Sequence, residues 1–175
     1  DRVHNPEPPT VELGEVINRT VARGGKVIVP SFAVGRAQTL LYCIHRLKAD
    51  GVVNEAIPVY LDSPMAVDVT ALYFRFRSLH RLSDDETRAM CRAVTIIGTP
   101  EESRALDLRA YPAVIIAASG MATGGRVLHH LHALAPDRRN TILFAGYQAA
   151  GTRGGRIVAG EQQVKMHGEM VPIRA

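Results

Sequence analysis

The sequence lacks most of the features that would place it in a common class of protein. It contains no tryptophan and only two cysteines, and no apolar run approaches the roughly 20 residues that span a membrane. The P-loop pattern G-x-x-x-x-G-K-[ST] is absent, and G-x-G-x-x-G follows none of the strand-like segments. The pattern G-x-S-x-G is absent as well. These absences argue against a membrane span, a P-loop or dinucleotide-binding fold, and a serine hydrolase.

The two cysteines, Cys43 and Cys91, each lie in a helix-like segment and form no C-x-x-C pair. Isolated cysteines of this kind are typical of reduced packing residues, so we expect a cytoplasmic protein. The chain begins with Asp1, and no signal-peptide pattern follows. We therefore expect a processed chain or a segment cut from a longer protein.

Lysine is also scarce, because arginine supplies 18 of the 21 basic residues. The formal net charge is +4 and the pI is near 9.4, values compatible with a polyanionic partner. Guanidinium groups suit phosphate recognition better than ammonium groups do. Genomic base composition produces the same bias, so arginine content alone does not establish a nucleic-acid partner.

Strand-like and helix-like segments alternate along the 175 residues, a length that suffices for one domain with a core. The expected strands are residues 27–30, 58–61, 94–97, 113–117 and 141–145, followed by a hairpin of 163–166 and 170–173. Such alternation is typical of a parallel sheet covered by helices. The sequence therefore predicts an α/β domain with an open, mainly parallel sheet of about six strands and helices on both faces.

Several helix boundaries are marked locally. The segments 83–86 and 99–102 are capping boxes, and Pro64 suits the first turn of a helix. Gly24 and Gly25 are expected to end the first helix.

The most informative segment is the glycine-rich stretch 119–126, Ser-Gly-Met-Ala-Thr-Gly-Gly-Arg. It follows the apolar run 113–118 and precedes the amphipathic stretch 127–134, an order typical of strand, turn and helix. A turn of this kind directs backbone N–H groups and a helix N-terminus at one point, which suits a phosphate. Arg126, in the first helical turn, is placed to add a bidentate contact.

Four loops that follow expected strands carry hydroxyls, arginines or glycines: 31–36, 62–66, 119–126 and 146–156. The carboxyl ends of parallel strands line the ligand crevice of an open α/β sheet, so these loops predict a phosphate-binding edge. The side chains expected to gather there are Ser31, Arg36, Ser63, Ser119, Arg126, Tyr147 and Arg153. The alternatives are that Ser31 and Ser63 cap helices and that Gly124 and Gly125 only permit close packing. Asp62 is expected to cap the helix that follows it, and the alternative is that it positions a partner.

Three of the seven histidines are clustered, namely His129, His130 and His132. At about 100° per helical residue, His130 and His132 point some 160° apart, so the three cannot converge on one ion. Only His129 and His132 are spaced to share one, and we expect solvated or flanking histidines rather than ligands. No Ser/His/Asp or Cys/His arrangement stands out. The chain thus offers binding groups and no catalytic residues.

Together the four loops show a family resemblance. The segments 30–38, 61–66, 119–126 and 146–152 resemble the β-CASP domain of metallo-β-lactamase-fold RNA-processing nucleases. The similarity is to the subgroup of the pre-mRNA 3′-end cleavage endonuclease and its prokaryotic relatives, since ribonuclease J differs at the Ser119 loop. The resemblance implies that residues 1–175 form one β-CASP domain, excised from a larger chain. Because an inserted domain leaves and re-enters its host at one place, we expect Asp1 and Ala175 near each other at the ligand edge.

The resemblance also implies where the chemistry lies. In such proteins two zinc ions, held in the metallo-β-lactamase domain of the same parent chain, activate a water for attack on an RNA phosphodiester. This chain alone would then hold no catalytic or metal-binding residue and cleave nothing. Its role would be to cover the cleft and hold the RNA. The candidate contacts are Ser31, Arg36, Ser63, Ser119, Gly120, Gly124, Gly125, Arg126 and Tyr147.

Alternatives remain open from the sequence. One is a non-catalytic RNA-binding or scaffold domain from an inactive homologue, which flanking metal-ligand motifs would distinguish from an enzyme. Another is an independent phosphate-ligand domain, which tight, salt-insensitive binding of a mononucleotide would favour. A homodimer is a further option, because the family often dimerises.

The glycine-rich stretch yields a prediction for the parent protein. Arg126→Ala is expected to weaken RNA binding and to flatten its salt dependence, because a phosphate contact would be lost. The measurement is RNA affinity at a series of salt concentrations. An unchanged affinity and an unchanged salt slope would contradict a role for Arg126 in RNA binding.

Overall fold

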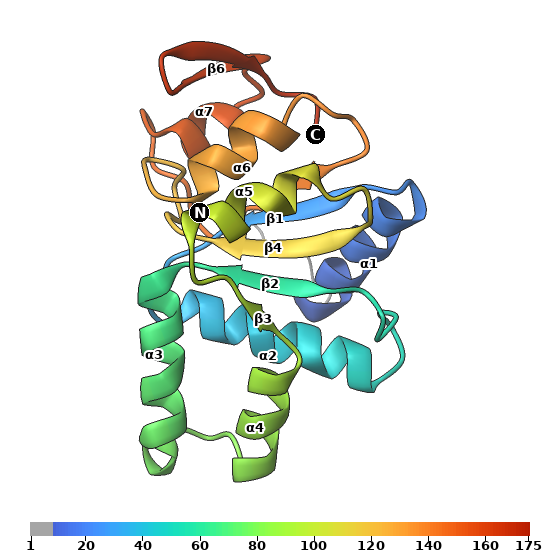
Figure 1. Cartoon of the computed structure of the whole chain (residues 1–175), viewed down its shortest axis with the longest axis vertical. Coiled ribbons are helices and arrows are strands. Elements are labelled where there is room, and N and C mark those ends of the chain that lie inside the picture. Colours follow the sequence, from blue (N-terminus) through green and yellow to red (C-terminus); the bar gives the residue numbers. More distant parts are fainter. Residues whose placement is uncertain (1–8) are drawn as a thin grey trace.

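The computed structural model describes residues 9–175, which form a central sheet flanked by helices (Figure 1). The sheet has five strands, is parallel throughout, and has the strand order β3-β2-β4-β1-β5. The strands are β1 (Lys26–Pro30), β2 (Val59–Asp62), β3 (Thr95–Ile96), β4 (Ala113–Ala117) and β5 (Thr141–Ile142). The predicted open parallel sheet is confirmed. Asp1 lies outside the described residues, so its expected proximity to Ala175 stays a prediction.

Two expected strands are shorter than the sequence predicts. The strands expected at 94–97 and 141–145 become the two-residue strands β3 and β5. Both lie at the edges of the sheet and pair on one side only, so fewer hydrogen bonds hold them extended. Their short length leaves the following residues free to form loops at the carboxyl edge.

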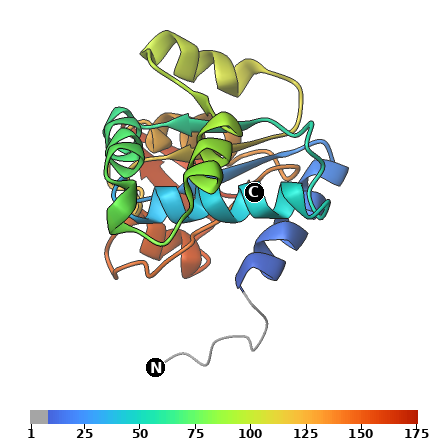
Figure 2. The same ribbon diagram turned by 90° about the horizontal axis from the view of Figure 1, so that it is seen from below.

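The helices cover both faces of the sheet, as expected. They are α1 (Pro9–Ala22), α2 (Arg36–Ala49), α3 (Pro64–Arg75), α4 (Asp84–Arg92), α5 (Pro100–Leu108), α6 (Val127–Leu134) and α7 (Arg153–Val158), with a 3₁₀ turn at Arg77–Leu79. Figure 2 shows α5 on one side of the sheet and α1 and α2 on the other. Among residues 9–175, no helix is both long enough and apolar enough to cross a membrane.

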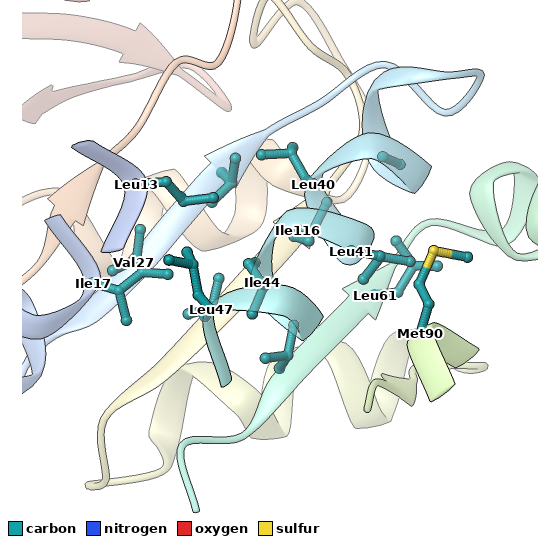
Figure 3. Close-up of a cluster of buried hydrophobic side chains, with 14 of the residues drawn as sticks. Leu13, Ile17, Val27, Leu40, Leu41, Ile44, Leu47, Leu61, Met90 and Ile116 are labelled. Atoms are coloured by element: carbon teal, nitrogen blue, oxygen red, sulfur yellow. The ribbon is translucent and has the colours of Figure 1, made fainter. Parts of the chain in front are cut away.

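Each face of the sheet has its own apolar core, because successive strand residues point to opposite faces. The residues Val27, Val29, Val59, Leu61, Val114 and Ile116 pack with α1, α2 and α4 (Figure 3). The residues between them, Ile28, Tyr60, Ala113, Ile115 and Ala117, pack with α5, α6 and the C-terminal hairpin. Burial on both faces explains why these strands are continuous apolar runs in the sequence.

The C-terminal hairpin consists of β6 (Gln163–Met166) and β7 (Glu169–Pro172), which pair antiparallel. His167 and Gly168 both have positive φ and make the turn between them. The hairpin is confirmed, but its strands pair with each other and do not join the five-stranded sheet. Val164, Met166 and Val171 are buried in the core beside α6, so the hairpin closes that side of the domain.

The predicted helix boundaries are confirmed. Ser83 and Thr99 each accept a hydrogen bond from the backbone N–H three residues on, and Glu86 and Glu102 complete the capping boxes. Pro64 stands in the first turn of α3. Gly24, with φ 74°, follows the end of α1. Local signals therefore set the ends of these helices.

Both cysteines are free thiols and are partly buried. Burial raises the pKa of the Cys43 thiol, against a smaller opposing effect of Arg36, and burial likewise raises the pKa of Cys91. Thiols in this environment are poor nucleophiles, which fits the expected packing role.

The core beside α6 can be tested with two leucines in helices. Leu131 is 0% exposed and Leu108 is 87% exposed. We expect Leu131→Ala to lower the free energy of unfolding by about 2–5 kcal/mol, because it removes buried contacts and leaves a cavity. Leu108→Ala, the control, is expected to change it by no more than about 0.5 kcal/mol. Urea unfolding measures both values, and equal losses would contradict this assignment of the core.

Candidate nucleic-acid interface

The loops after β1, β4 and β5 meet at the carboxyl edge of the sheet, on the left in Figure 1. They line a depression of about 170 Å³, called the edge depression below. Its lining residues are Pro30, Phe32, Arg36, Gly120, Met121, Ala145, Gly146, Tyr147 and Gln148. Three of the candidate contacts, Arg36, Gly120 and Tyr147, are therefore brought together here. Parallel strands explain the convergence, because all of them end at this edge.

Arg36 is the first residue of α2 and its side chain is exposed at the edge depression. Within residues 9–175, its guanidinium has no carboxylate or carbonyl partner. Gly35, with φ 77°, turns the chain into the helix immediately before it. Arg36 is thus a positive charge with unused hydrogen-bond donors, held on a rigid helix end, and such a group suits an anion.

Tyr147 lines the edge depression from a different loop and is 79% exposed. The loop that carries it is tied down by the side-chain amide of Gln148. That amide nitrogen donates to the carbonyl oxygens of Gly120 (3.0 Å), Tyr147 (3.1 Å) and Gly146 (3.3 Å). Gln148 therefore fixes the loop after β5 against the loop after β4.

The glycine-rich loop satisfies much of its own hydrogen bonding. The Ser119 hydroxyl accepts from the backbone N–H groups of Thr123 (3.0 Å) and Gly124 (3.2 Å). The Ser119 N–H donates to the Gly124 carbonyl at 3.1 Å. The sequence predicts backbone N–H groups free for a phosphate, but those of Thr123 and Gly124 are already bound to Ser119. The hydrogen bonds of Ser119 therefore hold this turn closed.

Two glycines in this loop are required by close approach. Gly125 has φ +76°, and a Cβ there would lie 2.5 Å from the Ala118 carbonyl oxygen. A Cβ on Gly120 would lie 2.7 Å from the ring of Phe32. The alternative role of close packing therefore applies to Gly125, whereas Gly124 has open space around it. Gly120 lets an aromatic ring rest directly on the backbone.

Arg126 points away from the edge depression and into the protein. Its guanidinium donates to Asp62 Oδ1 at 2.5 Å, to the Ile97 carbonyl at 3.1 Å and to the Gly98 carbonyl at 2.9 Å. Its side chain is only 18% exposed. The bidentate phosphate contact that the sequence suggested would require these bonds to break. A loss of RNA affinity in Arg126→Ala would therefore also report a displaced loop.

The partner of Arg126 is a fully buried carboxylate at the end of β2, Asp62. Its Oδ2 accepts from the His130 ring at 2.8 Å and from the Ser103 hydroxyl. The expectation that Asp62 caps the following helix is wrong, because Ser63 does so by accepting from the Ala66 N–H at 3.2 Å. The capping alternative is thus correct for Ser63, and Asp62 turns inward instead.

His130 lies between two carboxylates, and its expected solvated or flanking position is wrong. It is fully buried, with Nε2 at 2.8 Å from Asp62 and Nδ1 at 2.6 Å from Asp107. Ionised carboxylates only accept hydrogen bonds, so both ring nitrogens donate and the ring is positively charged. Burial acts to lower the pKa of His130, but hydrogen bonds to Asp107 and Asp62 outweigh it and raise that pKa to about 9.

These side chains form a buried network in which the charges balance. Burial acts to raise the pKa of Asp62, but hydrogen bonds from His130, Arg126 and Ser103 outweigh it and lower that pKa. Two carboxylates, Asp62 and Asp107, then face two cations, Arg126 and His130. A neutral network of this kind avoids the large cost of an unpaired buried charge. It joins the end of β2 to α5 and α6.

The sequence carries a signal for this network in the spacing of Arg126 and His130. These residues stand at positions i and i+4, so they lie on the same face of a helix. Asp62 follows three apolar residues at the end of an expected strand. Their pairing depends on how β2, α5 and α6 stack, and spacing along the chain does not reveal that.

The other clustered histidines lie at the surface between α6 and the hairpin. The ring of His129 stacks on that of His167 at 4.5 Å, and His132 meets the same ring edge-on at 5.9 Å. His132 Nε2 lies 3.0 Å from a carboxylate oxygen of Glu169. In the described part of the chain, no three histidine, cysteine, aspartate or glutamate side chains are placed to hold a metal ion.

Two further predicted residues serve the fold around the edge depression. Ser31 is buried, and its hydroxyl donates to the Phe32 carbonyl at 3.2 Å, so it caps no helix. Arg153 donates to the Lys165 carbonyl at 2.7 Å and to the Thr123 carbonyl at 3.1 Å. It ties the glycine-rich loop to the hairpin and does not line the edge depression.

Comparisons with known proteins bear on this site. A family model described as the Beta-Casp domain matches residues 37–157. Ribonuclease TTHA0252 of Thermus thermophilus is 40% identical over 185 residues, covering 100% of this chain and 42% of that protein. Transcription termination factor FttA is 34% identical in Lokiarchaeum (91% of this chain, 26% of that protein) and 36% identical in Methanocaldococcus jannaschii (87% and 25%). The chain thus spans less than half the length of these relatives.

The buried network predicts a pH dependence of stability. The folded-state pKa of His130, about 9, lies above its ordinary value of 6.5. Protonated His130 therefore contributes fully to the free energy of unfolding below pH 6.5, and this contribution is lost as the pH rises toward 9. The difference corresponds to roughly 3 kcal/mol. His130→Gln is therefore expected to be much less stable than wild type at pH 6. The difference in free energy of unfolding between the two proteins is expected to shrink toward pH 9.

Urea unfolding between pH 6 and pH 9 measures this gap. Ser103→Ala is the control, because it removes a hydrogen bond to Asp62 but no titrating group. The loss of free energy of unfolding in Ser103→Ala, relative to wild type, is expected to stay constant between pH 6 and pH 9. A His130→Gln deficit that is equally large at pH 6 and pH 9 would contradict a charged His130.

Proposed function

The chain belongs to the Beta-Casp domain family, and we propose that it is the substrate-holding part of a zinc-dependent ribonuclease that hydrolyses RNA phosphodiester bonds. The observation that carries the proposal is the edge depression, where Arg36 presents unused donors beside an exposed Tyr147. Relatives of this chain are named ribonuclease and transcription termination factor. Among residues 9–175, the edge depression is a place that suits a nucleic acid.

Electrostatics supports an RNA ligand. The chain carries a net charge of +4, and the charges of the buried network cancel within it. Arg36 is the cation of the edge depression that no protein group neutralises within residues 9–175. A phosphate there would gain charge-assisted hydrogen bonds without displacing an existing ion pair.

The described residues bind and orient, and they supply no metal centre. No set of three suitable ligands occurs among residues 9–175, so the zinc ions implied by the family resemblance do not fit this part of the chain. In the proposal they belong to the metallo-β-lactamase domain of the parent protein. Here Arg36 would bind a phosphate of the RNA, and the glycine-rich loop, fixed through Arg126, would shape the wall beside it.

Arg36→Ala tests the RNA contact in the whole protein that carries this domain. We expect weaker RNA binding and a salt slope that falls by about one, because one phosphate contact is lost. Arg19→Ala is the matched control, since Arg19 is exposed near the end of α1 that leads into the amino edge of β1. Fluorescence anisotropy with a labelled RNA at several salt concentrations gives both values. Equal slopes for the two variants would contradict the assignment.

The catalytic part of the proposal has a separate test. The whole protein is expected to cleave a labelled RNA, to lose this activity on zinc chelation, and to regain it when zinc is restored. RNA binding without cleavage under zinc-replete conditions would indicate a non-catalytic scaffold. Absence of both binding and cleavage would overturn the proposed function.

A further inference from the structure

We propose that Phe32 and Tyr147 form a stacking platform for one unpaired nucleobase at the edge depression. This inference rests on the proposed function and adds to it the residues that contact a base. It is carried by the exposure of the two aromatic side chains, by the backbone contacts around them, and by the cation Arg36 in the same depression.

Phe32 is the first of these side chains. It follows β1 by two residues and remains 49% exposed. Its ring rests on Gly120, where any Cβ would come within 2.7 Å of it. A large apolar ring left half in water costs free energy, yet here the backbone of another loop is shaped to seat it. The arrangement fixes the ring and leaves part of it open for a ligand.

Tyr147 supplies the second aromatic surface. It is 79% exposed and lines the same edge depression as Phe32. Its loop is fixed by the Gln148 amide, which donates to the Tyr147 and Gly120 carbonyls. Gly120 therefore supports Phe32 with its Cα and is bonded to the Tyr147 loop through its carbonyl. One residue thus supports both the Phe32 ring and the backbone that carries Tyr147.

Aromatic residues are scarce in this chain, at 5%, which makes two exposed ones in one small depression informative. A phosphate contact alone needs only donors, and Arg36 already supplies these. Aromatic rings instead stack on the π-face of any base, and Arg36 beside them matches the phosphate of the same nucleotide. The lining thus corresponds to one nucleotide: a base and its phosphate.

Stacking on the platform determines which nucleic acid can use it. In a duplex the base faces are already stacked on their neighbours and hidden, so none is available to the platform. A single strand can turn one base out onto the platform. We therefore expect little sequence preference and a strong preference for unpaired RNA.

The experiment compares two ligands that carry the same phosphates. The whole protein, with a zinc chelator to keep the RNA intact, is titrated with a labelled single-stranded RNA and with an abasic strand of equal length. Wild type is expected to bind the RNA about tenfold to a hundredfold more tightly than the abasic strand. Phe32→Leu and Tyr147→Leu are expected to reduce this ratio towards one while leaving abasic binding unchanged. Tyr147→Phe keeps the ring and is expected to keep the ratio.

Two controls separate stacking from other effects. Tyr111→Leu removes an exposed aromatic next to the amino end of β4 and is expected to leave the ratio unchanged. Tyr147 is so exposed that its substitution should not unfold the protein, so a failure of Phe32→Leu to fold would not remove the test. The affinity for a duplex of the same sequence is expected to be unchanged by Tyr147→Leu, because its bases are already stacked.

The outcomes distinguish the two proposals. Equal wild-type affinity for RNA and abasic strand, or a base preference that survives Tyr147→Leu, would overturn the stacking platform while leaving RNA binding intact. Failure to bind either strand would overturn both this inference and the proposed function.

Discussion

The arrangement of this domain depends on one buried carboxylate. Asp62 ends β2 with no solvent around it and accepts hydrogen bonds from Arg126, His130 and Ser103. Its donors come from α5 and from α6 with its N-cap, so those helices are fixed to the strand by charge as well as by apolar packing. Removing one member of such a set leaves another charge buried and unpaired, which is far costlier than losing a surface ion pair. That asymmetry makes the network a strong constraint on how the layers stack.

The network also determines which groups are left for a ligand. Arg126 and Ser119 stand in the loop that the sequence marks most strongly, yet both are engaged in holding that loop in shape. The groups that face the edge depression come mainly from the neighbouring loops, through Arg36 and Tyr147. In the proposed function these two tasks are separate: the glycine-rich loop gives the site its form, and the loops after β1 and β5 would contact the ligand.

The fold was largely predictable from the sequence because its signals are local. Apolar runs buried on both faces, capping boxes at Ser83 and Thr99, and the turn at Gly168 each act within a few residues. The edge strands are shorter than their apolar runs predict, because pairing on one side holds only two residues of each extended. At the site, the convergence of Arg36 and Tyr147 followed from parallel topology. The inward turn of Asp62 and the burial of His130 did not, because they depend on side chains distant in sequence and on the stacking of β2, α5 and α6.

The neutrality of the buried network separates two responses to ionic strength. Ions in solution screen exposed charges strongly and buried pairs weakly, so added salt would compete with a phosphate at Arg36 while the Asp62 cluster kept its bonds. The walls of the edge depression would then keep their form in a solution that releases the ligand. Salt would then change the affinity of the domain for its ligand without changing the conformation of the site.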